Sequence, residues 1–374
     1  MVNEANDKKK YHVLIGCSVV VVYFFVAVRP IPVETVLTPQ WLISLESEYP
    51  LYFEDGNRTD RGDRPETQGN EGPLLPFTLG DHFGYFNTGG GFALNRKVRG
   101  KVSISENFWA EYDAVPRSIE IRDPQNAVLA EISEPLGYPF FIDNQVFLIN
   151  EEQNSLTALD NQGNRLWTYD FAAPVTDIDA AAGLILVGSL DGVVELLDLS
   201  GKRVFVFESG GSRYSAIYGC RISRDGSKLA IISGFDDQRF LLMERLGDSY
   251  KVAYHEFLSD GFRRPVHIAF IDNDRWVVFE SEGSLALYNI GARNSIKLPL
   301  EGNIIALDSS GTDNLIFIIT SLSERKKQLV EIRLPQDIIM KAPFSSENIF
   351  LTRQEQGLYI GGGSTIASFA LNKR

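Results

Sequence analysis

Few residues in this chain of 374 have the types and spacing that catalysis requires. Its histidines are scarce, and none stands at the spacing of a zinc-binding pair. They are His12, His82, His255 and His267. His267 lies on a predicted strand and is interpreted as a packed side chain. The aspartate pairs, such as Asp177/Asp179 and Asp272/Asp274, fall at expected turns or strand ends, where Asp–Gly and Asp–Asn turns account for them. The sequence therefore indicates neither an activated nucleophile nor a metal centre.

A second group of residues has the composition of a protein-binding surface. Phe235 and Arg239 lie in one unusually long stretch of the chain, and Phe262, Arg263 and Arg264 lie in the next. Extra length on a rigid scaffold goes into loops, and such loops commonly bind partners. Arginine and aromatic residues are also enriched at protein interfaces. These five residues are the predicted protein-binding site, with a solvated hairpin as the alternative.

Composition favours a β-rich globular domain and argues against nucleic acid as a partner. The chain is 44% hydrophobic, with 24 Phe, 14 Tyr and 32 Gly. Aromatic side chains suit pleated, half-buried surfaces, and glycine suits the turns between them. The net charge is -13. A protein that neutralises phosphates needs a basic face, so we expect no nucleic-acid binding.

The elements that position these residues are short strands repeated along the chain. The clearest unit, from Pro139 to Phe171, divides into PFFID, QVFLIN, SLTALD and RLWTYD, and residues 175–208 repeat this pattern. Asp160 and Asp198 close the third strand of each unit before a glycine turn. Second strands are expected to begin near Phe108, Val146, Leu184, Leu229, Trp276, Leu315 and Leu358. Units of about 40 residues match propeller blades, so the sequence predicts an all-β, seven-bladed β-propeller with four-stranded blades.

Closure of the predicted ring needs a strand from outside the repeats. The last unit shows three strand-like segments and then the chain stops. An orphan strand-like segment, His82 to Lys97, precedes the first unit. Placing this segment in the last blade would complete that blade and remove an exposed sheet edge.

One unit carries a family resemblance. Leu156-Thr-Ala-Leu-Asp160, followed by Gly163 and Trp167, resembles the PQQ-like (quinoprotein-type) propeller repeat, and Phe205 takes the place of the tryptophan in the next unit. Other units resemble WD40-like propellers in general. Quinoprotein dehydrogenases of this kind have eight blades and commonly a disulfide of adjacent cysteines, whereas the cysteines here are Cys17 and Cys220. The resemblance therefore implies a member without cofactor, similar to propeller adaptors of the bacterial envelope.

The N-terminus has the pattern of a membrane anchor. Three lysines precede residues 11–28, an uncharged apolar stretch long enough to span a bilayer. The sequence predicts a cytoplasmic N-terminus at residues 1–10, a transmembrane signal anchor at 11–28, an extracytoplasmic stalk and disordered tether at 29–80, and a propeller at 81–374. A lipoprotein processed at Cys17 is the alternative. Either way the propeller would lie in the periplasm or otherwise outside the cytoplasmic membrane.

These observations predict a single-pass inner-membrane protein whose propeller acts as a binding scaffold or adaptor. Its expected partners are other envelope proteins, and the membrane through residues 11–28. No cofactor, metal or catalytic residue is expected. The alternative function is an extracytoplasmic enzyme, similar to lactonase or glycosidase propellers, with a site in the central channel. That alternative requires carboxylates and a histidine from several blades to converge on the channel.

Overall fold

A computed structural model describes residues 35–54, 57–59, 72–258, 261–308, 310 and 314–373. The regular structure of these residues consists entirely of β-strands. Residues 38–370 form one compact unit. Residues 1–37 and 371–374 make a second, small unit, of which only the first residues of β1 and the last residues of β33 are described.

Six sheets contain four antiparallel strands each, and the strands of each sheet follow one another along the chain. We number these sheets blades 1 to 6. Blade 1 contains β7 (Lys101–Ile104), β8 (Trp109–Tyr112), β9 (Ser118–Arg122) and β10 (Val128–Ser133). Blade 2 contains β11 (Tyr138–Ile142), β12 (Gln145–Ile149), β13 (Ser155–Leu159) and β14 (Arg165–Asp170). Blade 3 contains β15 (Val175–Ala181), β16 (Leu184–Ser189), β17 (Val193–Asp198) and β18 (Arg203–Glu208). Blade 4 contains β19 (Ile217–Ile222), β20 (Lys228–Ser233), β21 (Arg239–Leu246) and β22 (Ser249–Phe257). Blade 5 contains β23 (Ile268–Ile271), β24 (Trp276–Ser281), β25 (Ser284–Asn289) and β26 (Asn294–Pro299). Blade 6 contains β27 (Asn303–Asp308), β28 (Leu315–Ser321), β29 (Lys326–Arg333) and β30 (Asp337–Ser345).

The remaining two sheets use the beginning of the described chain. Blade 7 contains β31 (Ile349–Gln354), β32 (Gly357–Gly362) and β33 (Thr365–Lys373), with β1 (Thr35–Ser44) beside β33 as its fourth strand. β2 (Leu51–Glu54) and β3 (Asn57–Thr59) extend this sheet to six strands. Blade 8 contains β4 (Leu74–Leu79), β5 (His82–Asn87) and β6 (Phe92–Lys97). It is the three-stranded sheet.

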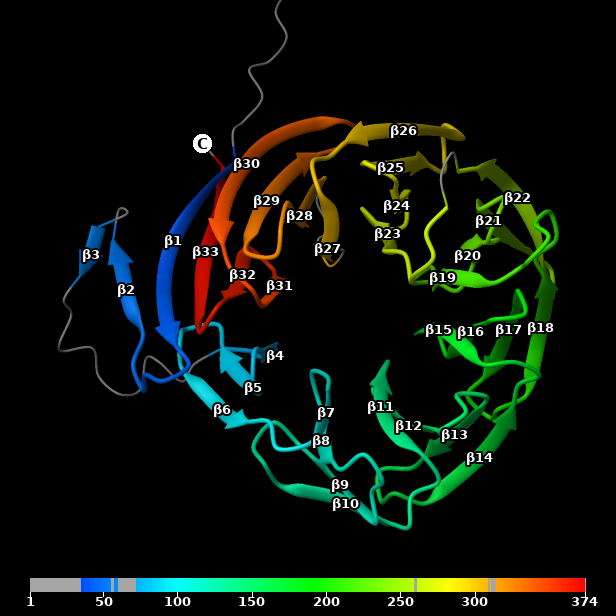
Figure 1. Cartoon of the computed structure of the whole chain (residues 1–374), viewed down its shortest axis with the longest axis horizontal. Coiled ribbons are helices and arrows are strands. Elements are labelled where there is room, and N and C mark those ends of the chain that lie inside the picture. The colour runs from blue at the N-terminus through cyan, green and yellow to red at the C-terminus, as the bar shows by residue number, and fades with distance from the viewer. Residues whose placement is uncertain are drawn as a thin grey trace, which may run out of the picture. The chain divides into compact units, whose positions relative to one another are not determined.

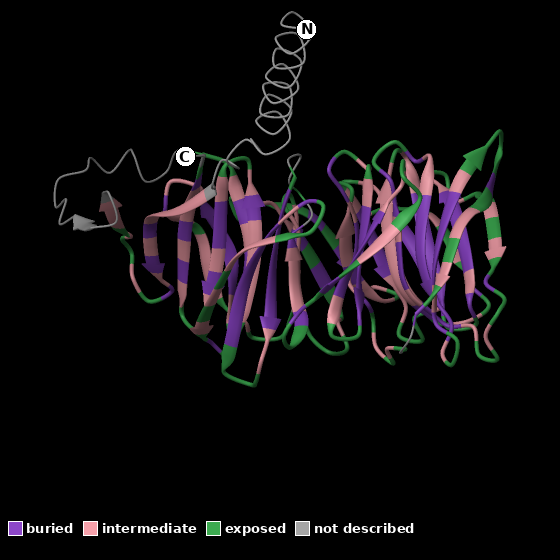
Figure 2. Cartoon of the chain, turned by 90° about the horizontal axis from the view of Figure 1, so that it is seen from above, coloured by how far each residue is buried: buried purple, intermediate pink, exposed green. Residues whose placement is uncertain are grey.

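The sheets stand side by side in a ring, with the first strand of each blade nearest the axis (Figure 1). The middle strands are buried almost without interruption, as in β16 and β20, because neighbouring blades cover both of their faces (Figure 2). The hydrophobic core therefore lies between blades. One cluster joins Leu186 and Leu196 of blade 3 to Leu229 and Met243 of blade 4.

The repeated turns are closed by an aspartate that accepts hydrogen bonds from its own backbone. Asp160 Oδ1 accepts the N–H groups of Gln162 (2.9 Å) and Asn164 (2.8 Å). Asp198 Oδ1 accepts the N–H groups of Ser200 and Lys202 in the same way. Hydrogen bonds from the Asn164 side chain to Asp160 and from the Ser200 side chain to Asp198, with smaller contributions from these backbone bonds, lower the pKa of both carboxyl groups. The aspartates recur because they build the turn.

The tryptophan of blade 2 packs against a glycine of blade 3. The Trp167 Nε1–H group donates to Leu199 O at 2.8 Å, and its ring lies over Gly201. A Cβ on Gly201 would lie 2.5 Å from Trp167 Cδ2. Gly201 also has a φ of +79°, in the left-handed region that favours glycine. The Asp-turn-Gly-Trp pattern thus couples the local turn to the packing of adjacent blades.

The predicted blade count is wrong, because the ring has eight blades rather than seven. All seven predicted second strands exist, as β8, β12, β16, β20, β24, β28 and β32. The error lies at the closure. Residues 82–97 do not complete the last blade, since they form β5 and β6 of the additional blade 8, and β1 completes blade 7 instead.

The predicted boundaries of the N-terminal part also differ from the structure. β1 and β4 are blade strands, although they lie within residues 29–80, which the sequence predicts as stalk and tether. Among the described residues, no helix is long and apolar enough to cross a membrane. The predicted single-pass topology, and the periplasmic location inferred from it, therefore have no transmembrane helix to support them in the part of the chain that the structure describes. Residues 1–28, with the predicted anchor and Cys17, lie outside the described residues.

Candidate functional site

A pocket of about 650 Å³ lies at the first strands of blades 3, 4 and 5, which face the axis (Figure 1). Its polar lining includes Asp177 and Asp179 from β15, Arg221 from β19, and His267, which immediately precedes β23. We call these four residues the channel set. Carboxylates and a histidine from separate blades do converge here. The two aspartates stand in the interior of β15, and not at a turn or strand end as the sequence indicated.

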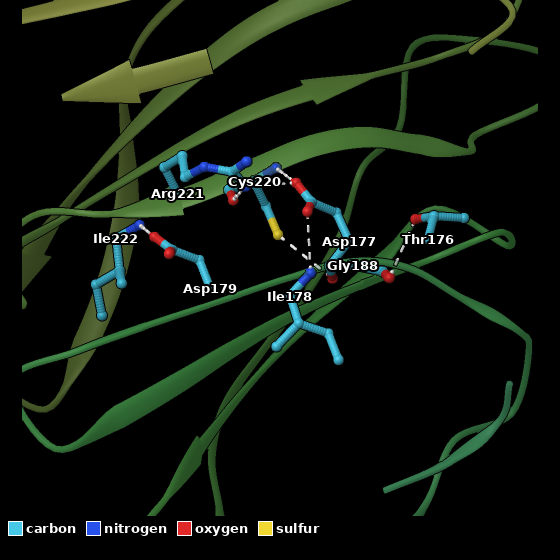
Figure 3. Close-up of polar contacts among 8 residues, drawn as sticks. All are labelled: Thr176, Asp177, Ile178, Asp179, Gly188, Cys220, Arg221 and Ile222. Atoms are coloured by element: carbon cyan, nitrogen blue, oxygen red, sulfur yellow. Dashed lines mark hydrogen bonds and ion pairs between the residues drawn. The ribbon is translucent and has the colours of Figure 1, made fainter. Parts of the chain in front are cut away.

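Both carboxylates of the channel set hold blade 3 to blade 4 (Figure 3). Asp177 Oδ2 accepts the Cys220 N–H group (2.8 Å) and a hydrogen bond from Arg221 Nη1 (2.7 Å). Asp179 Oδ2 accepts the Ile222 N–H group at 2.8 Å. The carboxylates of β15 thus accept N–H groups of the neighbouring first strand, β19, as the backbone carbonyl groups of a paired strand would.

The electrostatics of the channel set follow from this burial and pairing. Burial raises the pKa of the Asp179 carboxyl group, and this effect outweighs the hydrogen bond from the Ile222 N–H group, which lowers the pKa. Burial alone would lower the pKa of Arg221, but Asp177 and Asp179 raise it overall. Burial lowers the pKa of His267, which favours its neutral form. Cys220, a free cysteine, is fully buried behind this set, and burial raises the pKa of its thiol.

The channel set is better suited to holding blades 3 and 4 together than to hydrolysis. A general base or nucleophile needs an oxygen directed at substrate, but Asp177 is held by an arginine and an amide of the next blade. Asp179 likewise accepts a backbone amide. In the described part of the chain, no group of three His, Cys, Asp or Glu side chains could hold a metal ion.

Four of the five predicted binding residues come together between blades 4 and 5. Phe235 lies between β20 and β21, whereas Phe262, Arg263 and Arg264 lie between β22 and β23. The Arg263 guanidinium carbon is 4.6 Å from the centroid of the Phe235 ring. That of Arg264 is 4.7 Å from the centroid of the Phe262 ring. Each arginine is therefore positioned for a cation–π interaction.

Tyr214 belongs to the same surface, although it is not among the predicted binding residues. Its ring lies 6.2 Å from that of Phe235, edge to face, and the residue is 56% exposed. Arg213 lies 5.4 Å from the centroid of the tyrosine ring. The available signal was the Arg213-Tyr214 pair in a glycine-rich loop before β19. We call Tyr214, Phe235, Phe262, Arg263 and Arg264 the arginine–aromatic cluster.

The loops that carry this cluster are tied together by one buried side chain. Gln238 is fully buried, and its Nε2 donates to Gly234 O (3.2 Å) and Phe262 O (3.1 Å). Its Oε1 accepts the Phe262 N–H group at 3.0 Å. The Phe235 N–H group donates to Tyr214 O at 2.9 Å. These hydrogen bonds join the described parts of three loops into one surface.

Arg264 has a structural role in addition to its place in the cluster. Its Nη1 and Nη2 donate to the two carboxylate oxygens of Glu280, at 3.0 and 2.6 Å. The Glu280 side chain is 3% exposed, so the arginine neutralises a buried charge. The hydrogen bonds from Arg264 to Glu280 raise the arginine pKa.

Arg239, the fifth predicted residue, packs against the loop that carries Tyr214. Its guanidinium group packs against Gly211, where a Cβ would lie 2.9 Å from Nη1. Its Nε is buried without a hydrogen-bond partner among the described residues, and burial lowers the pKa of Arg239. The structure therefore groups Arg239 with the loop before β19, and not with the two phenylalanines.

Eight radial sheets whose first strands surround a common axis define a β-propeller. The chain belongs to a family described as beta-propeller protein, whose model matches residues 3–373. It is 26% identical over 354 residues to an uncharacterized protein of Treponema pallidum (strain Nichols), across 95% of this chain and 92% of that protein.

Solved structures with a similar fold come from unrelated settings. BamB from Moraxella catarrhalis is similar with a TM-score of 0.59 and 15% identity, covering 90% of this chain and 98% of that chain. A chain of the mitotic checkpoint complex gives a TM-score of 0.54 at 11% identity, over 85% of this chain and 98% of that chain. Similarity at this level of identity concerns the fold alone. The PQQ-like identity of the repeat is not confirmed by these comparisons.

Proposed function

We propose that this propeller is a protein-binding scaffold or adaptor, and that the arginine–aromatic cluster is one of its contact surfaces. The observation that carries the proposal is the stacking of Arg263 on Phe235 beside the exposed Tyr214 ring. Aromatic and arginine side chains dominate binding energy at interfaces when they are held rigidly. Gln238 fixes the loops, so little conformational entropy remains to be lost on binding.

The fold is compatible with this function, since a chain of similar fold belongs to the mitotic checkpoint complex. The channel pocket supports an enzyme less well, because its carboxylates already bind the amides of the next blade. A scaffold needs a rigid surface with exposed anchors, and the cluster supplies one.

The test begins by identifying the partner through this surface. A photo-crosslinking amino acid replaces Tyr214 in the full-length protein, and crosslinked proteins are identified by mass spectrometry. The control places the same amino acid at Leu246, which is 62% exposed and stands at the opposite end of β21 from Phe235. We expect a partner that is captured from position 214 and not from position 246.

The affinity of the purified partner is then measured by calorimetry. Arg263→Glu should weaken binding at least tenfold, because it removes a stacked cation and introduces repulsion or an unpaired charge. Arg245→Glu makes the same charge change on an exposed residue at the far end of β21 and should have no effect. Arg264 is left intact, since its loss would expose the buried Glu280 charge. Equal affinities of the two variants would refute the proposed surface.

A further inference from the structure

Three arginines at the arginine–aromatic cluster form no ion pair with any residue that the structure describes. They are Arg213, between β18 and β19, Arg239, at the beginning of β21, and Arg263, between β22 and β23. Arg264, next to Arg263, is by contrast paired with Glu280. The chain has 49 Asp and Glu residues against 36 Lys and Arg residues, so a shortage of carboxylates does not explain the difference.

Two of these guanidinium groups lie against aromatic rings. The guanidinium carbon of Arg213 is 5.4 Å from the centroid of the Tyr214 ring, and that of Arg263 is 4.6 Å from the centroid of the Phe235 ring. A ring stabilises a cation through its quadrupole but carries no net charge, so the N–H donors can still pair with a carboxylate. Both arginines are therefore positioned without being neutralised.

Arg239 is the arginine whose surroundings are least favourable for its charge. Its Nε atom is buried and makes no hydrogen bond within the described part of the chain. Burial lowers the pKa of this guanidinium group, because part of the group is withdrawn from water and no carboxylate compensates. The side chain is only half-buried. A carboxylate on its exposed side would supply the opposite charge.

The loop before β19 connects Arg239 with the aromatic rings. A Cβ on Gly211 would lie 2.9 Å from Nη1 and 3.0 Å from Cζ of Arg239, so the guanidinium group occupies the space that a side chain there would need. Further along this loop, Ser212 Oγ and Tyr214 O both accept the Phe235 N–H group, at 3.2 and 2.9 Å. The three arginines thus border one contiguous surface, formed by this loop and Phe235.

The acidic residues beside this surface do not pair with its arginines. Asp236 and Asp237 directly follow Phe235 and are exposed. Neither forms an ion pair with an arginine in the part of the chain that the structure describes. Their charges therefore oppose an incoming carboxylate without neutralising the arginines by direct pairing.

We propose that the partner of this surface presents an acidic segment whose carboxylates pair with Arg239, Arg263 and Arg213. The inference rests on the proposed function, to which it adds the chemistry of the partner. Hydrogen bonds between charged groups are stronger than those between neutral groups. A chain with a net charge of -13 repels an acidic segment over most of its surface, so the arginines also decide where the segment docks. Tyr214 is 56% exposed and offers its ring to an apolar side chain between the carboxylates.

The experiment measures the binding of two short peptides to the full-length protein by fluorescence anisotropy. The acidic probe is rhodamine-labelled Asp-Glu-Phe-Glu-Asp-amide, and its control is the isosteric Asn-Gln-Phe-Gln-Asn-amide with the same label. The acidic probe should bind about tenfold more tightly at about 50 mM salt. Raising the salt to about 500 mM should weaken its binding about tenfold, because salt screens exposed charges.

Two substitutions locate the binding of the acidic probe. Arg239→Gln should weaken it about tenfold, whereas Arg245→Gln, on an exposed residue near the other end of β21, should not. Gly211→Ala keeps every charge, but its methyl group would displace the Arg239 guanidinium group, so it should also weaken binding. Gly247→Ala is the control, since Gly247 has a positive φ and nothing within 4 Å of an added Cβ. Circular dichroism checks that each variant is folded.

The nearby carboxylates provide a test in the opposite direction. Asp236→Asn combined with Asp237→Asn should strengthen binding of the acidic probe about twofold or more, because two repelling charges are removed. Asp248→Asn, on an exposed residue beyond the other end of β21, should leave the affinity unchanged. A gain in affinity cannot result from a loss of folding.

Several results would overturn the inference. These are equal binding of the acidic and amide probes, no binding of either, or binding that neither Arg239→Gln nor Gly211→Ala weakens. A captured protein whose affinity depends on Arg263 but changes with neither salt nor Arg239→Gln would keep the proposed function and overturn this inference. Binding of the acidic probe that requires Arg239, with no protein captured from position 214, would instead overturn the proposed function and keep the acidic specificity of the surface.

Discussion

Replacement of Gly201 by alanine should destabilise the propeller, because the new methyl group would clash with the Trp167 ring. Replacement of Gly247 by alanine, where no such clash occurs, is the control. Gly201 and Gly247 both have positive φ values, +79° and +65°. A Cβ on Gly247 would meet no atom within 4 Å, whereas a Cβ on Gly201 would lie 2.5 Å from Trp167 Cδ2. The two substitutions therefore share the backbone penalty, and only one adds a clash between blades.

The expected magnitudes follow from these two effects. An alanine in the left-handed region costs about 1–2 kcal/mol, which is the whole effect expected for Gly247→Ala. Overpacking against a ring that the neighbouring blade holds adds about 1–3 kcal/mol at Gly201. The Trp167 ring cannot simply move away, because its Nε1–H group is bonded to Leu199 O.

The assay is urea unfolding followed by circular dichroism, with the two variants compared at equal slope. Trp167→Ala in the Gly201→Ala background should reduce the effect of the alanine to that of Gly247→Ala, a coupling of about 1–3 kcal/mol. Equal destabilisation by Gly201→Ala and Gly247→Ala would refute the idea that this glycine exists to accept the tryptophan.

Three other perturbations test the ring closure, the channel and the cluster. Trp41, on β1, is 3% exposed, and its Nε1–H group donates to Thr88 O at 3.0 Å. Trp41→Ala should therefore lower the free energy of unfolding by about 3–5 kcal/mol in the same urea assay. A loss below about 1 kcal/mol would contradict closure of the ring by β1. Burial lowers the pKa of His267, so stability should fall as the pH drops below about 6.5, by at most about 1.4 kcal/mol per pH unit. His267→Gln should flatten this dependence in melting curves between pH 7 and 5, and an unchanged slope would assign it to other groups. Arg264→Ala should lower the free energy of unfolding by about 2 kcal/mol, because it leaves the buried Glu280 charge without a partner. Glu280→Gln in that background should restore part of the lost stability. No recovery in thermal melts would argue against the pairing of these two residues.

The strands that the sequence predicted correctly are those whose signals are local. In blade 3, the continuous apolar runs and the aspartate turn at Asp198 lie within a few residues of the strands that they define. Second strands such as β12, β24 and β28 are apolar runs of the same kind, bounded by turn residues. Buried middle strands with tight turns can therefore be predicted from local sequence, without knowledge of their distant contacts.

The elements that were missed depend on distant parts of the chain or follow a polar region. β1 contains Pro39, a residue expected at sheet edges, and its partner β33 lies at the other end of the sequence. β4 contains Pro76 and directly follows the polar residues 56–73. The signal for blade 8 was present, since only Gly80 and Asp81 separate Leu79 from His82, as in a two-residue hairpin.

The candidate sites were predictable in composition and not in geometry. Unusual loop length and residue type indicated Phe235 and Arg263, which the structure brings together. Gln238 ties their two loops together, and Tyr214 joins from a third loop through the hydrogen bond from the Phe235 N–H group to Tyr214 O, so these contacts depend on the fold. The bridge from Asp177 to Cys220 crosses between blades, so the sequence, read locally, indicated only a turn or strand end there.

The placement of β1 beside β33 has a consequence during synthesis of the chain. About 320 residues separate Ser44 from Thr365, the end of one strand and the beginning of its neighbour. At about 5–20 residues per second, a ribosome needs roughly 15 to 65 s to make that length. Throughout that time β1 must wait with an unpaired edge while the intervening blades are made. The first of the described strands to leave the ribosome is thus among the last to find its place, and the nascent chain depends on its surroundings to keep that edge from other partners.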